Sequence, residues 1–455
     1  QVLKHRNAFL DANPTESSHP LLVAERGMAS SKMEAALLVL LCSYDPDIVS
    51  MSAACIGELC QEADLTGESD ATLSVVANLE VYKELASTAA GAAGRAAQQK
   101  RVRKLLKRMT VLTVGNWNAW MDAHKRWVSI IQSAPASVTP ESAADAVERR
   151  SKQLMASLKG SSSGSVRSTS RSELTAPDEK LEWQHYAGFM CALAGISAPL
   201  ESAAARDGLV AVAGRPSGAA AMPVNSPSHR MLLFIEELLE YLVSESVVVR
   251  ESVRDIIGID LSPQLYPMLF NAIRSRVDTC FTPEAEVIGS DRNVLLVDQA
   301  VSLVRMSLER MTPNMEGMMS VDIESLILML TTYLSKMSRT IPILRTRNKA
   351  CQLLETLMSR TNVVAFRQEI KFRNKVLELV VDWTSDFGRA EGERPDELRD
   401  KLSRDLDIAC MKAIVALLYQ LPLQPDMAML GEGGNATLSD AKANLFYRYF
   451  SFLTK

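Results

Sequence analysis

The sequence predicts an all-α protein whose helical hairpins stack into an α-solenoid of degenerate HEAT or armadillo type. Apolar residues recur with helical spacing, and the alternation typical of strands is nowhere sustained. Of the 455 residues 47% are hydrophobic but only 5% aromatic, so Leu, Ala, Val and Met must fill the core. A single core stops growing at about 250 to 300 residues. Stacked amphipathic hairpins, without a crisp repeat motif, are therefore the architecture that we expect.

Two stretches show the helical period clearly. The first comprises Val321, Ile323, Leu326, Ile327, Leu330, Tyr333, Leu334 and Met337, and the second Leu406, Cys410, Ile414, Leu417 and Leu421. Helix starts also carry local signals. Ser31 stands three residues before Glu34, as in a capping box, and Ser262 and Thr282 each precede a proline. We expect helices to begin at these three positions.

Composition divides the chain into two helical blocks and a variable middle. Residues 157–177 are rich in serine and residues 198–228 in Ala, Gly, Pro and Ser, so both are predicted to be flexible linkers. The helix between them carries apolar side chains that must dock onto a flanking block. The predicted organisation is a helical repeat block at 1–156, a linker at 157–177, a docking helix at 178–197, a linker at 198–228 and a second repeat block at 229–455.

Charge and cysteine content limit the classes of binding partner and the cellular compartment that we expect. Fifty Lys and Arg against 54 Asp and Glu give a net charge of -4, which argues against nucleic acid as a partner. Seven scattered cysteines without a CxxC pair indicate buried thiols in a reducing compartment. The most apolar run, Ala35 to Leu41, is shorter than the about 20 residues of a membrane span, and no signal peptide opens the chain. We therefore expect a cytoplasmic protein. Gln1 in place of Met suggests a piece of a longer chain.

Motifs for catalysis, cofactors and metals are weak. Gly160 to Gly164 fits the GxSxG pattern of hydrolases, but that motif needs a turn from a strand into a helix. The five histidines lack the spacing of a helical zinc site. Gly431 to Gly434 lacks the lysine of a phosphate-binding loop. We expect no catalytic activity, no cofactor and no metal in residues 1–455.

The strongest charge cluster is a basic helix face. It comprises Lys100, Arg101, Arg103, Lys104, Lys107 and Arg108, with Val102, Leu105, Leu106 and Met109 on the opposite face. Such a face can attach to anionic lipid or to an acidic partner. The alternative is the solvated face of a packed helix, because patches of this size occur in many helical proteins. Arg345, Arg347 and Lys349 form a smaller cluster with the same two interpretations.

Three serines are candidate phosphorylation sites. Ser151, Ser170 and Ser217 each follow arginine at a spacing that basophilic kinases use, and phosphate added in a flexible segment can recruit or order a partner. Inert linker serines are the alternative, because such short matches arise often by chance.

Segments spread over most of the chain resemble neurofibromin and its fungal relatives, in the same order. They are Glu34 to Leu37, Cys55 to Asp64, Gly94 to Val102, Trp120 with His124 and Trp127, Leu261 to Asn271, Arg367 to Lys375, Asp382 with Trp383, Arg404 to Asp407, Leu421 to Pro425 and Leu445 to Phe450. Ordered matches are more specific than any single motif. By this resemblance the chain is the central helical region of a neurofibromin-like Ras GTPase-activating protein, a negative regulator of Ras signalling.

The resemblance also implies binding partners, and it assigns catalysis and scaffolding to different parts of the parent protein. The parent would bind a Ras-family small GTPase through a GTPase-activating domain that would begin near Lys455, and it would supply an arginine finger worth about 10³ to 10⁵ in rate. Residues 1–455 would then be a non-catalytic scaffold in a homodimeric parent, with at most peripheral association with the membrane where Ras resides. A free-standing adaptor solenoid that binds proteins or peptides in a groove is the alternative.

Overall fold

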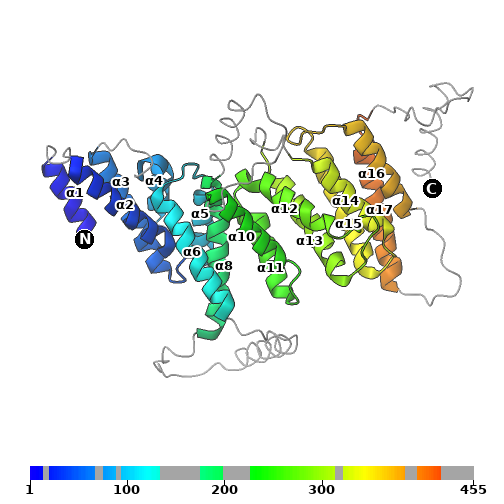
Figure 1. The fold of residues 1–455 in the computed structure, drawn as a ribbon, viewed down its shortest axis with the longest axis horizontal. Coiled ribbons are helices and arrows are strands. Elements are labelled where there is room, and N and C mark those ends of the chain that lie inside the picture. Colours follow the sequence, from blue (N-terminus) through cyan, green and yellow to red (C-terminus); the bar gives the residue numbers. More distant parts are fainter. Residues whose placement is uncertain are drawn as a thin grey trace, which may run out of the picture. The chain divides into compact units, whose positions relative to one another are not determined.

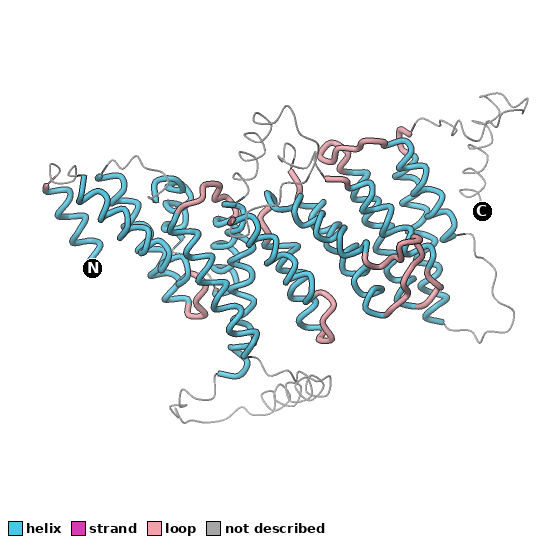
Figure 2. Tube along the Cα trace, viewed as in Figure 1, coloured by secondary structure: helices cyan, strands magenta, loops and turns pink. Residues whose placement is uncertain are grey.

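The structure, a computed structural model, describes residues 1–13, 20–66, 75–88, 94–133, 175–197, 226–312, 321–384 and 397–421. Within these residues the regular secondary structure is helical, apart from one isolated antiparallel bridge between Phe281 and Val287 (Figure 2). The prediction of an all-α protein is confirmed. The chain divides into two compact units, Gln1–Leu265 and Tyr266–Lys455. Their boundary falls inside the predicted repeat block at 229–455.

Unit 1 contains a succession of packed helices (Figure 1). Helix α2 packs on α6 and α6 on α8, while α3 contacts both α1 and α4, and α5 contacts α4 and α8. Its helices are α1 (Val2–Ala12), α2 (Pro20–Leu40), α3 (Pro46–Thr66), α4 (Leu79–Ser87), α5 (Arg95–Leu106), α6 (Val114–Ser133), α8 (Thr175–Leu193), α10 (Pro227–Tyr241) and α11 (Val247–Asp255). Short helical turns complete it: η2 (Val75–Asn78), η4 (Ala194–Ser197), the π-helix η5 (Ile256–Asp260) and η6 (Pro263–Leu265).

Helix α8 covers the stretch for which the sequence predicts a docking helix. It buries Tyr186, Phe189, Met190 and Leu193 against its neighbours. Helix α8 begins at Thr175 and α10 at Pro227, so the last residues of both predicted linkers are helical. The remainder of each linker lies outside the described residues.

An aromatic cluster joins α6 to α10. Trp120 and Trp127 lie two helical turns apart on α6, and Phe234 of α10 meets both rings edge-on, at centroid distances of 5.6 and 5.4 Å. His124 stacks on Trp120 at 5.3 Å and extends the cluster. Large fully buried rings at helical spacing thus fix α10 against α6.

Unit 2 contains helical hairpins in two rows (Figure 1). Helix α14 contacts α12 and α16 in one row, and α15 contacts α13 and α17 in the other. The helices are α12 (Tyr266–Asp278), α13 (Asp291–Arg310), α14 (Ile323–Lys336), α15 (Ile341–Ser359), α16 (Glu369–Thr384) and α17 (Glu397–Leu418). Both predicted apolar stripes are buried, on α14 and α17 respectively, except that Met337 follows the end of α14 and is half-buried.

Buried arginines cap helix ends in unit 2. Arg347 of α15 donates to the carbonyl oxygens of Leu334 (2.8 Å) and Met337 (2.9 Å), where α14 ends. Arg373 of α16 donates in the same way to Tyr419 O (2.9 Å), beyond the end of α17. The last carbonyl groups of a helix have no partner within it and carry partial negative charge, so a guanidinium suits them.

The smaller basic cluster of the sequence is therefore not a surface patch. Arg347 is only 4% exposed, and Lys349 forms an ion pair with Asp298 (2.7 Å). Arg345 alone of the three is exposed.

Two of the three described helix-start predictions are wrong. Ser31 lies inside α2, and the Glu34 carboxyl bonds to side chains far along the chain rather than to a helix terminus. Thr282 lies in the loop between α12 and α13, where its Oγ1 accepts a hydrogen bond from Glu286 N (3.2 Å). At Ser262 the prediction holds, because η6 begins at the following proline and leads into α12.

Candidate functional site

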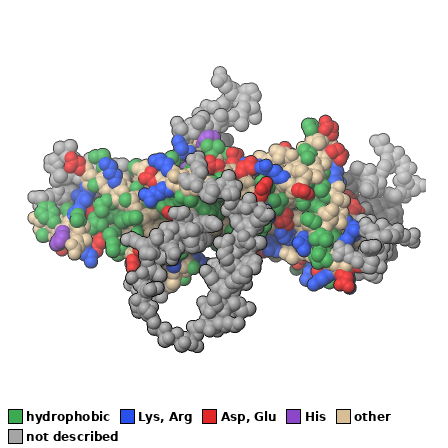
Figure 3. Space-filling model, turned by 90° about the horizontal axis from the view of Figure 1, so that it is seen from below, with side chains coloured by type: hydrophobic (Ala, Val, Ile, Leu, Met, Phe, Trp, Pro, Cys, Tyr) green, Lys and Arg blue, Asp and Glu red, His purple; other side chains and the backbone are tan. Residues whose placement is uncertain are grey.

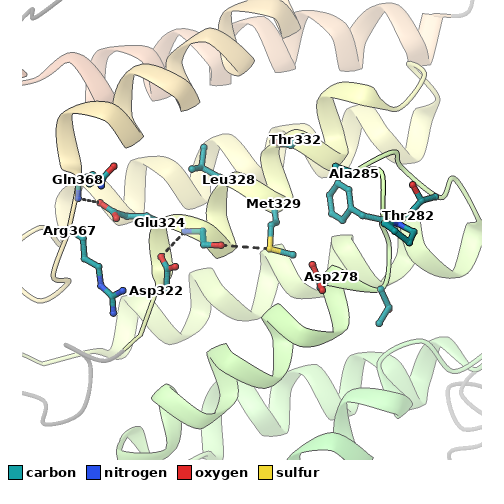
Figure 4. Close-up of a pocket in the computed structure, with 14 residues that line it drawn as sticks. Asp278, Thr282, Ala285, Asp322, Glu324, Leu328, Met329, Thr332, Arg367 and Gln368 are labelled. Carbon is teal, nitrogen blue, oxygen red and sulfur yellow. Dashed lines mark hydrogen bonds between the residues drawn. The ribbon is translucent and has the colours of Figure 1, made fainter. Parts of the chain in front are cut away.

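A groove of about 990 Å³ lies along α14 in unit 2 (Figure 4). Its floor comes from one face of α14, and its walls come from the end of α12, the loop that follows α12 and the segment before α16. The lining residues are Asp278, Thr279, Phe281, Thr282, Pro283, Ala285, Asp322, Glu324, Ser325, Leu328, Met329, Thr332, Arg367 and Gln368.

The floor is a second face of α14, distinct from its buried stripe. Ser325, Leu328, Met329 and Thr332 recur at the i, i+3, i+4, i+7 spacing of one helix face. All four are half-buried. Two apolar side chains in the middle are thus flanked by hydroxyls along the helix.

The loop 281–287 forms a fixed wall at one end. Ala285 has a φ of 62°, which turns the chain sharply. Two side chains of α14 hold this turn: Tyr333 Oη donates to Ile288 O (3.2 Å), and Lys336 Nζ donates to Ala285 O (2.9 Å). The wall therefore keeps its position relative to the floor.

Carboxylates organise the other end of the groove. Asp322 caps α14 by accepting a hydrogen bond from Ser325 N (3.0 Å), and it lies 3.8 Å from the guanidinium of Arg274. Glu324, which is 9% exposed, accepts a hydrogen bond from Gln368 N (2.9 Å). These bonds tie the segment before α16 to the start of α14.

Opposite charges line the groove on either side of its apolar floor. Figure 4 shows Arg367 beside Gln368 at one end, and Asp278 past Met329, on the side toward Thr282 and Ala285. Arg367 and Asp278 are both exposed. The groove thus offers a guanidinium, an apolar floor and a carboxylate in succession, which suits an elongated ligand held by side-chain contacts.

Sequence reasoning did not find this groove. Arg367 and Gln368 stood only in a segment of family resemblance, and Thr282 only as a helix start. The available signal was the second face of α14, where Leu328 and Met329 fall outside the buried stripe.

The basic cluster of the sequence lies on α5 and, for Lys107 and Arg108, just after its end, and the structure divides it. Arg103 is largely buried, whereas Lys100, Arg101 and Lys104 are exposed. Three of the cations bond within unit 1. Their partners are the Asp260 carboxylate for Arg103 (3.1 Å), the Ile259 carbonyl for Lys107 and the Glu84 carboxylate for Arg108.

The exposed remainder of the cluster is small. In the view of Figure 3, Lys and Arg side chains are interspersed with Asp and Glu on the described surface rather than gathered in one band. Attachment of α5 to anionic lipid or to an acidic partner stays a prediction that rests on Lys100, Arg101 and Lys104.

The other sequence candidates fall elsewhere. Ser151, Ser170 and Ser217 lie outside the described residues. Within the described ranges, no three or more His, Cys, Asp or Glu side chains are grouped so as to hold a metal ion. No helix among the described ones is both long and apolar enough to cross a bilayer.

Comparison with known proteins finds similarity to an inhibitory regulator protein. No family model matches it. It is similar to the inhibitory regulator protein IRA2 of Saccharomyces cerevisiae, at 23% identity over 233 residues. The match covers 49% of this chain and 8% of the yeast protein, so the chain corresponds to a small part of its relative's length.

Proposed function

We propose that residues 1–455 are a non-catalytic scaffold segment of a neurofibromin-like negative regulator of Ras signalling. The observation that carries this proposal is the 233-residue similarity to a yeast inhibitory regulator. The ordered resemblance to neurofibromin, from Glu34 to Phe450, supports the same class of protein.

The scaffold would be a degenerate HEAT or armadillo solenoid. The two helix rows of unit 2, built from successive hairpins, support this architecture. Arrays of this kind hold other domains at defined positions because each hairpin packs only on its neighbours. Such a segment would position the catalytic domain and contribute surface to a homodimer of the parent.

Catalysis would belong to a GTPase-activating domain outside residues 1–455. That domain would bind a Ras-family GTPase and supply its arginine finger. Two arginines near the C-terminal end are unsuited to this role, because Arg347 and Arg373 are buried and bonded to helix carbonyls. The parent would act in the cytoplasm, with peripheral recruitment to the membrane that carries Ras.

The test is GTP hydrolysis by purified Ras. Residues 1–455 should leave the intrinsic rate unchanged over a wide concentration range, whereas the parent protein should accelerate it strongly. Acceleration by residues 1–455 alone would overturn the scaffold assignment. A parent that lacks these residues but keeps its catalytic domain should stay active on soluble Ras and lose regulation of Ras in cells.

A free-standing adaptor is the second candidate, and the groove along α14 favours it. Adaptor arrays bind extended segments of partners without any catalytic domain. Reading the coding sequence after Lys455 separates the two proposals. A GTPase-activating domain there supports the Ras regulator, and a nearby stop codon supports the adaptor.

A further inference from the structure

We propose that the groove along α14 binds a short extended segment of a partner protein. The segment carries a basic side chain at one end, apolar side chains in the middle and an acidic side chain at the other end. This inference goes beyond the scaffold role, because it names a binding surface and the chemistry of its ligand.

The length of the groove sets the length of the segment. Its floor runs from Asp322, which caps α14, to Thr332 near the end of the helix. At 1.5 Å per residue this stretch measures about 15 Å. An extended chain advances about 3.3 Å per residue, so about five residues fill the groove.

The basic side chain belongs at the Asp278 end. Asp278 is the last residue of α12, where the helix dipole places partial negative charge that adds to the carboxylate. Its carboxylate is exposed and forms no ion pair with any described residue. A lysine or arginine of the ligand can reach it without displacing a residue of the fold.

The acidic side chain belongs at the Arg367 end. The two carboxylates nearby are already engaged, Asp322 with Ser325 N and Arg274, and Glu324 with Gln368 N. Arg367 is exposed and has no ion-pair partner among the described residues. Its guanidinium remains available for a carboxylate of the ligand.

The middle of the groove favours apolar side chains. Leu328 and Met329 rise from α14, and Phe281 faces them from the loop wall. These side chains are half-buried, so a ligand would remove from water apolar area that the fold leaves accessible. The opposed end charges distinguish this surface from one for nucleic acid or for a lipid headgroup, both of which require positive charge alone.

A charge-switch experiment tests the proposal on the purified chain. Three labelled peptides of about five residues share a leucine, alanine, leucine centre and differ at their ends: lysine with glutamate, lysine with lysine, and glutamate with glutamate. Fluorescence anisotropy should show that the mixed peptide binds tightest, by roughly fivefold, because each of the others meets one like charge.

Two variants should change the preferred peptide. In Asp278→Lys both ends of the groove are positive, so the peptide with two glutamates should bind best. In Arg367→Glu both ends are negative, so the peptide with two lysines should bind best. Both substitutions suit their helix ends, since a cation is favoured at the end of α12 and an anion just before α16. Circular dichroism should therefore show an unchanged fold.

Control variants complete the design. Met329→Gln keeps the volume of the floor but not its apolar character, and should lower the affinity for all three peptides. Glu251→Lys, at an exposed position on α11 of unit 1, should leave the affinity for each of the three peptides unchanged. Absence of saturable binding would overturn the proposal. So would a change in the order of peptide affinities that is as large in Glu251→Lys as in the groove variants.

Discussion

Arg103 of α5 and Asp260 at the end of η5 form an ion pair, with 3.1 Å between Nη1 and Oδ2, that lies directly against Gly188 of α8. A Cβ atom on Gly188 would come within 2.3 Å of that Nη1 and 3.0 Å of Oδ2. Only a residue without a side chain lets the pair pass α8 at this distance. One glycine thus allows α5, α8 and η5 to meet.

Gly188→Ala should destabilise unit 1 by about 1 to 3 kcal/mol, because Arg103 must give up its contact with Asp260 to make room. Urea denaturation measures the loss. In an Arg103→Met background the same substitution should cost much less, which identifies the ion pair as the cause. Gly94→Ala is the matched control, since no atom beyond its chain neighbours and local helix backbone lies within 4 Å of its added Cβ. Equal losses in both backgrounds would contradict this account.

Glu34 should make unit 1 less stable as pH rises. Burial raises the pKa of this carboxyl from 4.5 to about 7, while hydrogen bonds from Tyr82 and Thr113 act in the opposite direction. Between these values the unfolded chain releases the proton and the folded chain keeps it. The contribution of Glu34 to the free energy of unfolding should therefore be highest below pH 4.5 and should fall by about 3 kcal/mol by pH 8.

The substitution Glu34→Gln isolates this effect. The amide cannot ionise and still accepts a hydrogen bond from Tyr82, so the variant should lose the fall in stability between pH 5 and pH 8 that the Glu34 pKa of about 7 produces. Urea titrations at a series of pH values compare it with the parent chain. Parallel pH profiles for the two proteins would show that Glu34 is not the responsible group.

Arg373→Met should loosen the end of α17. The variant keeps the aliphatic packing but removes the donor to Tyr419 O, so the last carbonyl groups of the helix lose a buried charged partner. We expect a loss of about 1 to 3 kcal/mol in the free energy of unfolding and faster amide exchange in the last turn of α17. Arg345→Met, at an exposed position, should change neither quantity.

Native thiol labelling should distinguish one cysteine from the rest. Cys55 is half-buried, whereas Cys42, Cys60, Cys191, Cys280, Cys351 and Cys410 are buried. Cys351 and Cys410 lie 3.7 Å apart at Sγ, and their hydrogen bond together with burial raises the pKa of Cys351. A thiol reagent at neutral pH should label Cys55 first and the others only on unfolding. Early labelling of Cys410 would contradict the packing of α15 on α17.

The sequence predicted what depends on local periodicity. The predictions of buried apolar stripes on α14 and α17 were correct because a buried helix face repeats along one segment. These segments run from Ile323 to Leu334 and from Leu406 to Leu417. The capping box at Ser31 failed for a non-local reason. The partners of Glu34, Tyr82 and Thr113, lie 48 and 79 residues away.

The candidate site was beyond sequence reasoning for a similar reason. The groove takes its walls from Asp278, from the loop at Ala285 and from Arg367, which only the packing of three separate segments brings together. The sequence showed the basic face of α5. It could not predict that Arg103 forms a structural ion pair, because its partner Asp260 is far along the chain.

The arginine caps of unit 2 also have a mechanical consequence. Arg360, at the end of α15, donates to Glu309 O (2.8 Å) at the end of α13, and so links one hairpin to the next. Apolar contacts permit helices to slide, but a hydrogen bond weakens steeply when its angle changes. A shearing force along the rows would therefore meet directional resistance, and unit 2 would transmit a displacement from one hairpin to the next rather than absorb it.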